Sequence, residues 1–336
     1  MSYELIIGDC VNSMKSMPEQ SVNCCVTSPP YFGLRDYGVD GQIGLEETPE
    51  QYVAKMVEVF REVRRVLRDD GTLWLNIGDS YARQAGDDSK KDPKSINTGY
   101  SAVVAGGAAK KGNNRPPAGC KPKDLIGIPW MLAFALRADG WYLRQEIIWH
   151  KPNPMPESVK DRCTKAHEQI FLLSKSPRYY FDSEAVKEDA VGGQSGKAAS
   201  FKRENSKRSQ TVLGQGHGTH RPEREDVAYN GEKRNRRSVW SVATRPYKGA
   251  HFATFPPALI EPCILAGCPE GGVVLDPFGG SGTTAGVAVA HGRNAIICEL
   301  NPDYGLLSQE RVASIISRLS PANDNRSNSG GRNNDK

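Results

Sequence analysis

Two short segments of the 336-residue chain combine residue types that could bind a planar molecule and act on it. In the first, Thr-Ser-Pro-Pro-Tyr at residues 27–31 follows an apolar, β-branched run at residues 22–26. The Ser28 hydroxyl and the Pro29 carbonyl can accept hydrogen bonds, and consecutive prolines fix the turn so that both acceptors point outward. The Tyr31 ring offers a flat face for stacking. The segment therefore predicts a site for a planar group that carries an amino donor.

The second segment, Asp-Pro-Phe-Gly-Gly-Ser-Gly at residues 276–282, lies between a predicted strand and a predicted helix. Its glycines permit a tight turn and a close approach of a ligand, and the amides that begin the helix face an anionic group. The segment is not a P-loop, and it lacks the G-x-G-x-x-G pattern of dinucleotide folds. Glu299 ends the next predicted strand, where an acid can accept hydrogen bonds from both ribose hydroxyls. This end of the chain therefore predicts a nucleotide-like ligand.

The apolar pattern predicts strands that alternate with helices. Strands are expected at residues 3–7, 22–26, 72–77, 142–149, 169–174, 273–275 and 294–298, and helices at residues 11–17, 48–67, 125–136, 256–265, 284–291 and 303–319. Thr48 is the expected N-cap of the second helix, and Asp69-Asp70-Gly71 is expected to end it. The alternation predicts an α/β fold, with a mostly parallel sheet and helices on both faces. Ligands of such sheets bind at the carboxyl ends of strands, where both segments and Glu299 fall.

The net charge of +5 is distributed unevenly along the chain. Residues 83–123 carry nine Lys and Arg against three Asp and Glu, and residues 185–237 carry twelve against seven. The remainder of the chain is therefore acidic. A basic insertion in an acidic body is typical of a polyanion-binding segment, and two solvated loops are the alternative.

The eight cysteines form no Cys-x-x-Cys pair, so the sequence predicts no metal site. Several lie in apolar runs, as buried free thiols do in a reducing cytoplasm. Cys263 is expected to be such a core residue rather than a nucleophile. No apolar run approaches the roughly 20 residues that a membrane helix needs, and residues 1–9 do not resemble a secretory signal, so we expect no membrane association.

Together the two segments resemble those of the amino-group DNA methyltransferases, which use S-adenosylmethionine. The chemical turn at residues 27–31 precedes the cofactor turn at residues 276–282, as in the permuted β group of that family. The resemblance covers about residues 3–315, apart from the two basic segments. It implies a Rossmann-like S-adenosylmethionine-dependent methyltransferase fold with a basic target-recognition insertion.

The resemblance also implies roles for individual residues. Trp149 would be a second stacking face in the target-base pocket and Lys151 a phosphate or base contact, the alternative being an interior Trp and a surface Lys. The implied catalytic residues are Ser28, Pro29, Pro30 and Tyr31. The implied cofactor-binding residues are Asp9, Asp276, Pro277, Phe278, Gly279, Gly280, Ser281, Gly282, Thr283 and Glu299.

The expected domain organisation follows the same resemblance. A catalytic half with the target-base pocket spans residues 1–184 and includes a basic mobile loop at residues 83–123. A target-recognition insertion spans residues 185–237, the cofactor-binding half residues 238–319, and a disordered tail residues 320–336. The DNA-binding residues are expected to include Lys202, Arg203, Lys207, Arg208, Arg234, Arg236 and Arg237.

A serine in the first position of the chemical turn usually marks cytosine-N4 enzymes, whereas Asp or Asn usually marks adenine-N6 enzymes. The sequence therefore predicts a site-specific enzyme that methylates cytosine N4 in double-stranded DNA, by base flipping and direct displacement. The alternatives are adenine-N6 methylation, an RNA or protein methyltransferase, and a non-catalytic DNA-binding module. We expect a cytoplasmic, nucleoid-associated protein encoded by a bacterium or a phage. A cognate restriction endonuclease and a homodimer stay open.

Overall fold

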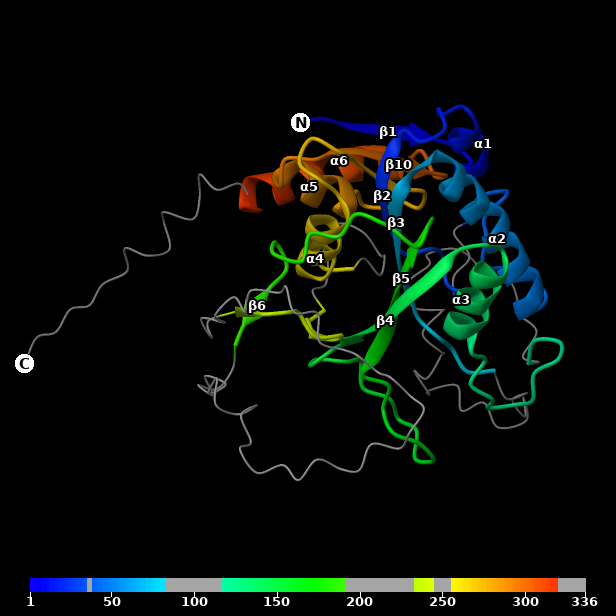
Figure 1. Ribbon diagram of the computed structural model, residues 1–336. Helices are drawn as coiled ribbons and strands as arrows, with labels where there is room; N and C mark the ends of the chain where they lie inside the picture. The colour runs from blue at the N-terminus through cyan, green and yellow to red at the C-terminus, as the bar shows by residue number, and fades with distance from the viewer. Residues whose placement is uncertain (35–37, 83–115, 191–232, 245–254, 320–336) are drawn as a thin grey trace, which may run out of the picture. The chain divides into compact units, whose positions relative to one another are not determined.

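The computed structural model describes residues 1–34, 38–82, 116–190, 233–244 and 255–319 (Figure 1). The chain divides into two compact units, one formed by Met1–Asp182 with Arg237–Lys336 and the other by Ser183–Arg236. In the second unit, the described residues include a short antiparallel pair, β6 (Glu188–Asp189) and β7 (Lys233–Arg234). All of the following elements belong to the first unit.

An eight-stranded sheet forms the centre of the first unit. Its order is β1 (Tyr3–Ile7), β10 (Asn294–Glu299), β9 (Val273–Asp276), β2 (Val22–Thr27), β3 (Leu67–Ile77), β5 (His167–Ser174), β4 (Tyr142–His150) and β8 (Val239–Ser241). The neighbours from β1 through β3 all pair in parallel, as do β4 and β8, and only β5 runs antiparallel to its neighbours. The predicted α/β class and the mostly parallel sheet are therefore confirmed.

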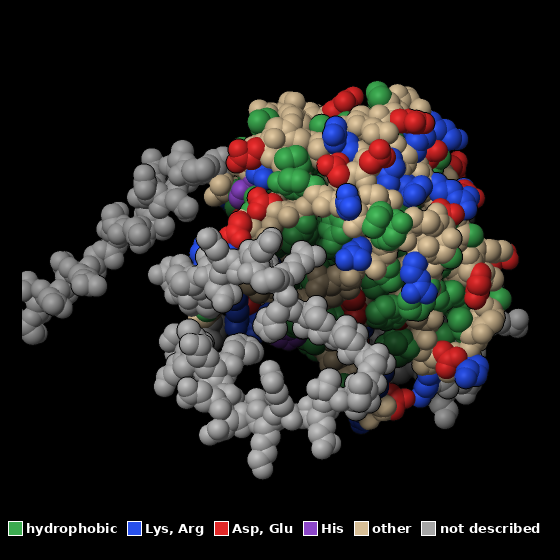
Figure 2. All heavy atoms as spheres, in the orientation of Figure 1, with side chains coloured by type: hydrophobic (Ala, Val, Ile, Leu, Met, Phe, Trp, Pro, Cys, Tyr) green, Lys and Arg blue, Asp and Glu red, His purple; other side chains and the backbone are tan. Residues whose placement is uncertain are grey.

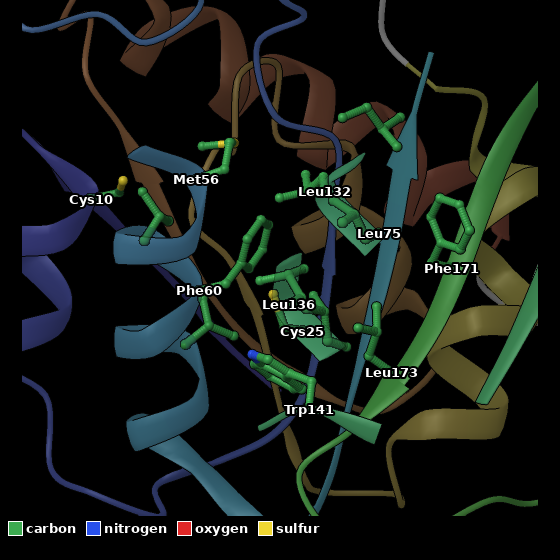
Figure 3. Close-up of a cluster of buried hydrophobic side chains, with 14 of the residues drawn as sticks. Cys10, Cys25, Met56, Phe60, Leu75, Leu132, Leu136, Trp141, Phe171 and Leu173 are labelled. Carbon is green, nitrogen blue, oxygen red and sulfur yellow. The ribbon is translucent and has the colours of Figure 1, made fainter. Parts of the chain in front are cut away.

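Helices cover both faces of this sheet, as Figure 1 shows. The helices α1 (Cys10–Lys15), α2 (Pro49–Val66) and α3 (Ile128–Ala138) lie on one face, and α4 (Pro257–Gly267), α5 (Thr283–Ala290) and α6 (Tyr304–Leu319) lie on the other. Strand residues alternate between the two layers: Leu73 and Leu75 of β3 belong to the core under α2 and α3, whereas Trp74 packs near Gly267 of α4. Figure 3 shows the first core, with Phe60 and Leu136 facing the sheet.

The longest helix of the described chain, α2, forms as its sequence pattern predicts. The Thr48 side chain accepts a hydrogen bond of 3.2 Å from the Gln51 amide, and Pro49 occupies the first turn. Tyr52, Met56 and Phe60 recur at helical spacing and are fully buried. The helix thereby fixes the position of β3 and of the turn that follows β2.

Two predicted boundaries are wrong. Residues 69–71 do not separate α2 from β3, because β3 already begins at Leu67, which is fully buried and pairs with Val22 of β2. Similarly, α3 begins at Ile128 and not at residue 125, because Gly127 adopts a left-handed φ of 85° and Leu125 pairs with Tyr81 in an isolated bridge. In both places a contact distant in sequence overrides the local pattern.

The outer side of α3 carries exposed aromatic side chains. Trp130 and Phe134 are 38% and 46% exposed, and Arg137 lies over the Phe134 ring, 4.9 Å from its centroid. Figure 2 shows hydrophobic side chains interspersed with Lys and Arg on the face that it presents. The Trp130 ring also meets Phe171 of β5 edge-on at 5.2 Å, so this contact fixes α3 on the strand that carries part of the site described below.

The sequence predicts neither a membrane helix nor a metal site, and it predicts buried free thiols. Within the described ranges, no helix is long and apolar enough to cross a membrane, and no three His, Cys, Asp or Glu side chains are grouped to hold a metal ion. All eight cysteines are free thiols, six of them buried. Cys263 is 1% exposed in α4, which confirms it as a core residue.

The contact between α5 and α6 depends on Gly286. A Cβ added there would lie 2.8 Å from the Ile315 Cβ, closer than packed atoms approach. We expect Gly286→Ala to lower the free energy of unfolding by about 1–2 kcal/mol, because overpacking outweighs the gain in helix propensity. Chemical denaturation measures this difference. Gly305→Ala in α6 is the matched control, since its Cβ would meet side-chain atoms at 3.7 Å, and an equal midpoint for the two variants would contradict the prediction.

Candidate active site

A cavity of about 180 Å³ opens at the carboxyl ends of four neighbouring parallel strands. Its wall includes Gly8 after β1, Ser28 after β2, Pro277 after β9 and Leu300 after β10. Such strand ends are where doubly wound sheets bind ligands, because helix N-termini and loops meet there. Segments from both ends of the chain thus line a single cavity.

Most of the predicted site residues meet in this wall. The lining includes the following members of the predicted set: Asp9, Ser28, Pro29, Pro30, Tyr31, Asp276, Pro277, Phe278, Gly279, Gly280, Ser281, Thr283 and Glu299. Gly282 is not among the lining residues. It adopts a left-handed φ of 75°, and a Cβ there would lie 2.8 Å from a methyl of Val312 in α6, so its place in the turn is explained by packing.

The Asp276 carboxylate connects the two turns. It accepts hydrogen bonds of 2.6 Å from the Thr27 hydroxyl and 2.6 Å from the Thr284 hydroxyl, and a third of 3.1 Å from the Phe278 amide. The carboxylate is almost completely buried, and this burial raises its pKa to about 6, although the three donors act in the opposite direction. Thr27 directly precedes Ser28, so this carboxylate fixes the chemical turn against the cofactor turn.

Glu299 holds the cofactor turn from the other side. Its carboxylate accepts hydrogen bonds from the amides of Gly280, at 2.9 Å, and Asn301, at 2.8 Å, and the Gly279 amide donates to the Cys298 carbonyl at 2.7 Å. Burial raises the pKa of Glu299 above its usual value. Each carboxylate oxygen has a further lone pair that these amides do not use.

These features fit a nucleoside-bearing cofactor. A Cβ at Gly279 would lie 2.8 Å from the Ile297 Cβ, so the glycine brings the turn against β10 and leaves the space in front of it open. The unused lone pairs of Glu299 can accept from ribose hydroxyls. Asp9 also lines the cavity, but one of its oxygens caps α1 by accepting from the Asn12 amide at 2.9 Å.

The chemical turn is anchored from behind. The Tyr52 hydroxyl of α2 donates to the Pro30 carbonyl at 2.8 Å. No described residue donates to the Pro29 carbonyl, which stays available in the cavity wall. The Ser28 hydroxyl donates to the Tyr31 hydroxyl at 3.5 Å. The turn therefore offers two adjacent oxygen acceptors beside the cofactor turn.

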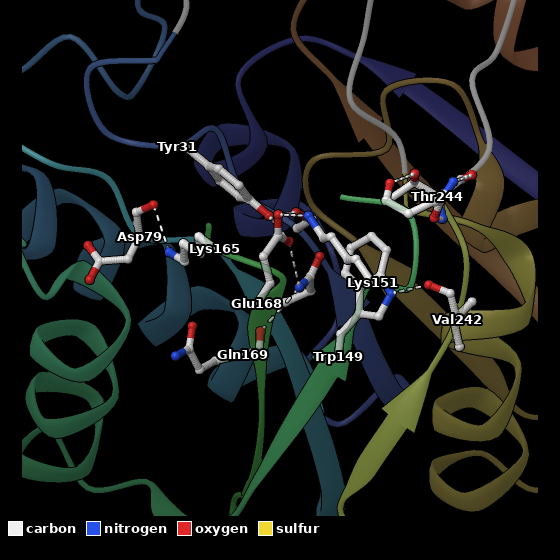
Figure 4. A network of polar contacts seen from close by, with 12 residues as sticks. Tyr31, Asp79, Trp149, Lys151, Lys165, Glu168, Gln169, Val242 and Thr244 are labelled. Atoms are coloured by element: carbon white, nitrogen blue, oxygen red, sulfur yellow. Dashed lines mark hydrogen bonds and ion pairs between the residues drawn. The ribbon is translucent and has the colours of Figure 1, made fainter. Parts of the chain in front are cut away.

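A polar network extends from Tyr31 to the antiparallel part of the sheet (Figure 4). The Tyr31 hydroxyl donates to Glu168 Oε2 at 2.8 Å, and Asn76 Nδ2 approaches the same oxygen at 3.3 Å. The Lys151 ammonium pairs with Glu168 Oε1. This ammonium also lies over the Trp149 ring, 4.4 Å from its centroid. Burial and the nearby Glu168 charge raise the pKa of Tyr31 well above its usual value, so the hydroxyl keeps its proton.

Trp149 occupies the interior position that the sequence analysis gave as the alternative to a stacking face. Trp149 is 4% exposed and does not line the cavity, one face of its ring is covered by Lys151, and its indole N–H donates to the Val242 carbonyl at 2.8 Å. Lys151 is engaged with Glu168 and does not line the cavity either. Both side chains support the Tyr31 network instead, because β4 lies beside β5, which carries Glu168.

Sequence reasoning missed several residues of the site. Glu168 is the second residue of β5 and belongs to no motif. The cavity wall also includes members of the segment that follows the chemical turn and residues from the cofactor half, namely Leu34, Val39, Gly41, Gln42, Ile43, Phe255, Asn301 and Tyr304. The glycines at positions 33, 38, 41 and 44 mark residues 32–44 as irregular, yet they do not indicate that Leu34, Val39 and residues 41–43 line the cavity.

Only part of the predicted DNA-binding set can be located. Lys202, Arg203, Lys207 and Arg208 lie outside the described residues. Arg234 pairs with Glu188 across β6 and β7, at 2.9 Å. Arg236 is half-buried, and the Arg237 carbonyl accepts from the Trp240 indole N–H at 2.7 Å.

Comparison with known proteins identifies the family. A family model described as DNA methylase matches residues 22–310. The chain belongs to this family. The methyltransferase is 47% identical over 310 residues to the Type II methyltransferase M.Cfr9I of Citrobacter freundii, covering 92% of this chain and 87% of the relative. It is 45% identical over 311 residues to the Type II methyltransferase M.SmaI of Serratia marcescens, covering 93% and 91%. The predicted family is therefore confirmed, and the chain is an S-adenosylmethionine-dependent DNA methyltransferase of the N4/N6 type.

Solved structures share the fold. The PvuII DNA methyltransferase, described as cytosine-N4-specific, superposes with a TM-score of 0.59 at 18% identity, covering 95% of this methyltransferase and 93% of that chain. A DNA modification methylase from Thermus thermophilus, in complex with S-adenosyl-L-methionine, gives a TM-score of 0.56 at 24% identity, covering 94% and 96%. The predicted Rossmann-like methyltransferase fold is confirmed by these similarities.

The raised pKa of Asp276 predicts a pH-dependent stability. Because the folded pKa, about 6, exceeds the ordinary aspartate value of 3.8, the folded chain binds more protons than the unfolded chain between these two values. This contribution to stability is complete below pH 3.8 and is lost as the pH rises through 6. We expect the free energy of unfolding of the wild type, relative to Asp276→Asn, to fall by about 2 kcal/mol between about pH 4.5 and about pH 7.5. Denaturation of both proteins across this range measures the difference, and a constant difference would contradict the assignment.

Proposed function

We propose that this methyltransferase modifies the exocyclic N4 of cytosine in double-stranded DNA. The observation that carries the proposal is the serine at position 28, whose hydroxyl lies with the Pro29 carbonyl in the wall of the cavity that Gly279 and Glu299 also line. A hydroxyl and a carbonyl can each accept one hydrogen of an amino group. The serine form of this turn favours cytosine over adenine as the target.

The proposed chemistry depends on geometry at the amino nitrogen. The lone pair of an exocyclic amino group is conjugated with the ring, which makes the nitrogen a poor nucleophile. By accepting hydrogen bonds from both amino hydrogens, Ser28 and Pro29 draw the nitrogen toward a tetrahedral shape and direct its lone pair. When bound, S-adenosylmethionine would supply the methyl group: a nitrogen–carbon bond would form as the carbon–sulfur bond breaks, the thioether S-adenosylhomocysteine would leave, and the amino nitrogen would lose one proton to water. Positioning by the turn and exclusion of water supply most of the rate enhancement.

No cysteine nucleophile takes part in this scheme. Cys10 and Cys298 line the cavity, and burial raises the pKa of each thiol to about 12, so both stay protonated. Direct displacement needs no covalent bond between enzyme and base. The target base must leave the duplex to reach a cavity of this kind, and we therefore include base flipping in the proposal.

The basic segment at residues 185–237 is proposed as the target-recognition region. The second compact unit, Ser183–Arg236, covers nearly the same residues and holds most of this basic charge. The curated relatives are named as Type II methyltransferases, which supports a role in restriction and modification beside a cognate endonuclease.

Mass spectrometry of the nucleosides released from treated DNA identifies the modified base. DNA exposed to the purified protein and isotopically labelled S-adenosylmethionine is digested and examined by mass spectrometry. We expect labelled N4-methylcytosine. Labelled N6-methyladenine would keep the fold and the chemistry but reject the specificity that we derive from Ser28, and labelled RNA or protein with unlabelled DNA would reject the proposed substrate.

The Ser28 hydroxyl is expected to act on turnover and not on cofactor affinity. We predict that Ser28→Ala lowers the single-turnover rate of methyl transfer by about 100-fold, because one of two acceptors is lost. Calorimetry should find the affinity for S-adenosylmethionine unchanged within about threefold. Ser21→Ala, directly before β2 and far from the cavity end of that strand, is the control, since the Ser21 hydroxyl donates to the Pro18 carbonyl. Near-normal turnover of Ser28→Ala would remove the residue from the proposed mechanism.

Binding of DNA should weaken steeply with salt. Because phosphate contacts by Lys and Arg release counterions, we predict that affinity falls by at least about 100-fold between about 50 and about 200 mM salt. Fluorescence anisotropy with a labelled duplex measures the slope, and S-adenosylmethionine affinity over the same range serves as the control. A flat profile would argue against phosphate-led recognition.

A further inference from the structure

The hydrogen-bond network behind the chemical turn has a defined polarity. A tyrosine hydroxyl carries one proton, and the Tyr31 hydroxyl donates it to Glu168 Oε2 at 2.8 Å. The carboxylate can only accept. The Tyr31 oxygen is thereby left as an acceptor toward its other neighbour, Ser28, at 3.5 Å.

This polarity determines what the serine offers to the cavity. With its single proton directed at Tyr31, the Ser28 hydroxyl presents only lone pairs to a bound molecule. Without an acceptor behind Tyr31, either hydroxyl could turn its proton toward the cavity, where it would meet the hydrogens of an amino group. A distance of 3.5 Å is long for such a bond, and contacts of this kind commonly shorten once substrate is bound.

Two side chains and burial hold the Glu168 carboxylate in place. Lys151 pairs with its Oε1, Asn76 Nδ2 lies 3.3 Å from its Oε2, and the side chain of Glu168 is only 14% exposed. Lys151 is itself fixed by the Trp149 ring. On the other side, a Cβ at Gly78 would lie 2.6 Å from Tyr31 Cε2 and 3.3 Å from Glu168 Cδ, so only glycine allows the two side chains to meet there.

We propose that Glu168 is a positioning residue for methyl transfer, which acts through the Tyr31 hydroxyl to make the Ser28 hydroxyl an obligate acceptor for the target amino group. The inference rests on the proposed function of Ser28. It assigns Tyr31 a second role besides stacking, and it gives Trp149 and Lys151 a role that does not require contact with the base. Asn76, Lys151 and Trp149 form the support of the carboxylate.

A double-mutant cycle tests whether Glu168 acts through Tyr31. The single-turnover rate of methyl transfer is measured for the wild type, Tyr31→Phe, Glu168→Gln and the double variant. We expect each single variant to lose about 10- to 100-fold in rate, and the double variant to lose no more than either, because both changes remove the same directed proton. The affinity for S-adenosylmethionine should stay within about threefold, since neither side chain holds the cofactor turn.

Independent roles would give a different result. If the loss in the double variant equals the product of the two single losses, Glu168 does not act through Tyr31 and the inference is overturned, as it is if Glu168→Gln retains the wild-type rate. Glu157→Gln is the matched control, because Glu157 also pairs with a cation, Arg162, but makes no described contact with Tyr31. Should Glu168→Gln fail to fold, a cycle of Tyr31→Phe with Ser28→Ala tests whether Tyr31 acts through Ser28, and a double loss equal to the product of the single losses would overturn the inference.

The outcome is separable from that of the proposed function. The base modified by the wild type is identified first, and the cycle is then measured on that base. N6-methyladenine with a non-additive cycle would reject the cytosine specificity and keep the role of Glu168. N4-methylcytosine, with a double-variant loss equal to the product of the single losses, would keep the cytosine specificity and reject the role of Glu168.

Discussion

The hydrogen bonds that Thr27 and Thr284 donate to the buried Asp276 carboxylate, both 2.6 Å long, connect the end of β2 to the turn that follows β9. The two strands are parallel neighbours, with Cys25 opposite Leu275, so their carboxyl ends meet at one edge of the sheet. Burial of this carboxylate is unfavourable, as its raised pKa indicates, and three donors offset part of that cost. The chemical turn and the cofactor turn, which lie far apart in the sequence, therefore keep a fixed separation.

This constraint explains why the order of motifs along the chain matters little to the site. The cavity requires that β1, β2, β9 and β10 end side by side, and the sheet order β1-β10-β9-β2 achieves this whichever segment is synthesised first. The remaining strands serve another purpose. β5 and β4 extend the sheet beyond β3 and bring Glu168, Trp149 and Lys151 up to the back of the chemical turn. The parallel half thus contains the cavity, and the antiparallel half supports one of its walls.

The features that local patterns determine were predictable, and those that depend on strand order were not. The α2 cap at Thr48 and the glycine-rich turn after β9 depend on residues a few positions apart, which the sequence displays directly. The role of Trp149 depends on β5 inserting between β3 and β4, and no local pattern specifies that order. Glu168 escaped notice for the same reason. The sequence assigned Gly282 to the cofactor site together with its neighbours, whereas the lack of space for a Cβ beside Val312 of α6 is visible only in three dimensions.

The network of Tyr31 and Glu168 behind the chemical turn matters because residue 28 is a serine and not an aspartate. A carboxylate in that position would have only lone pairs to present, so its role as acceptor would need no help from its surroundings. A hydroxyl both donates and accepts, and it serves an amino group only if its proton is directed elsewhere. On the proposal made above, Tyr31 and Glu168 provide that direction, and Lys151 and Asn76 keep the carboxylate in position to do so. On this proposal, a turn that begins with serine depends on a buried acceptor behind it, and methyl transfer involves β5 as well as the turn itself.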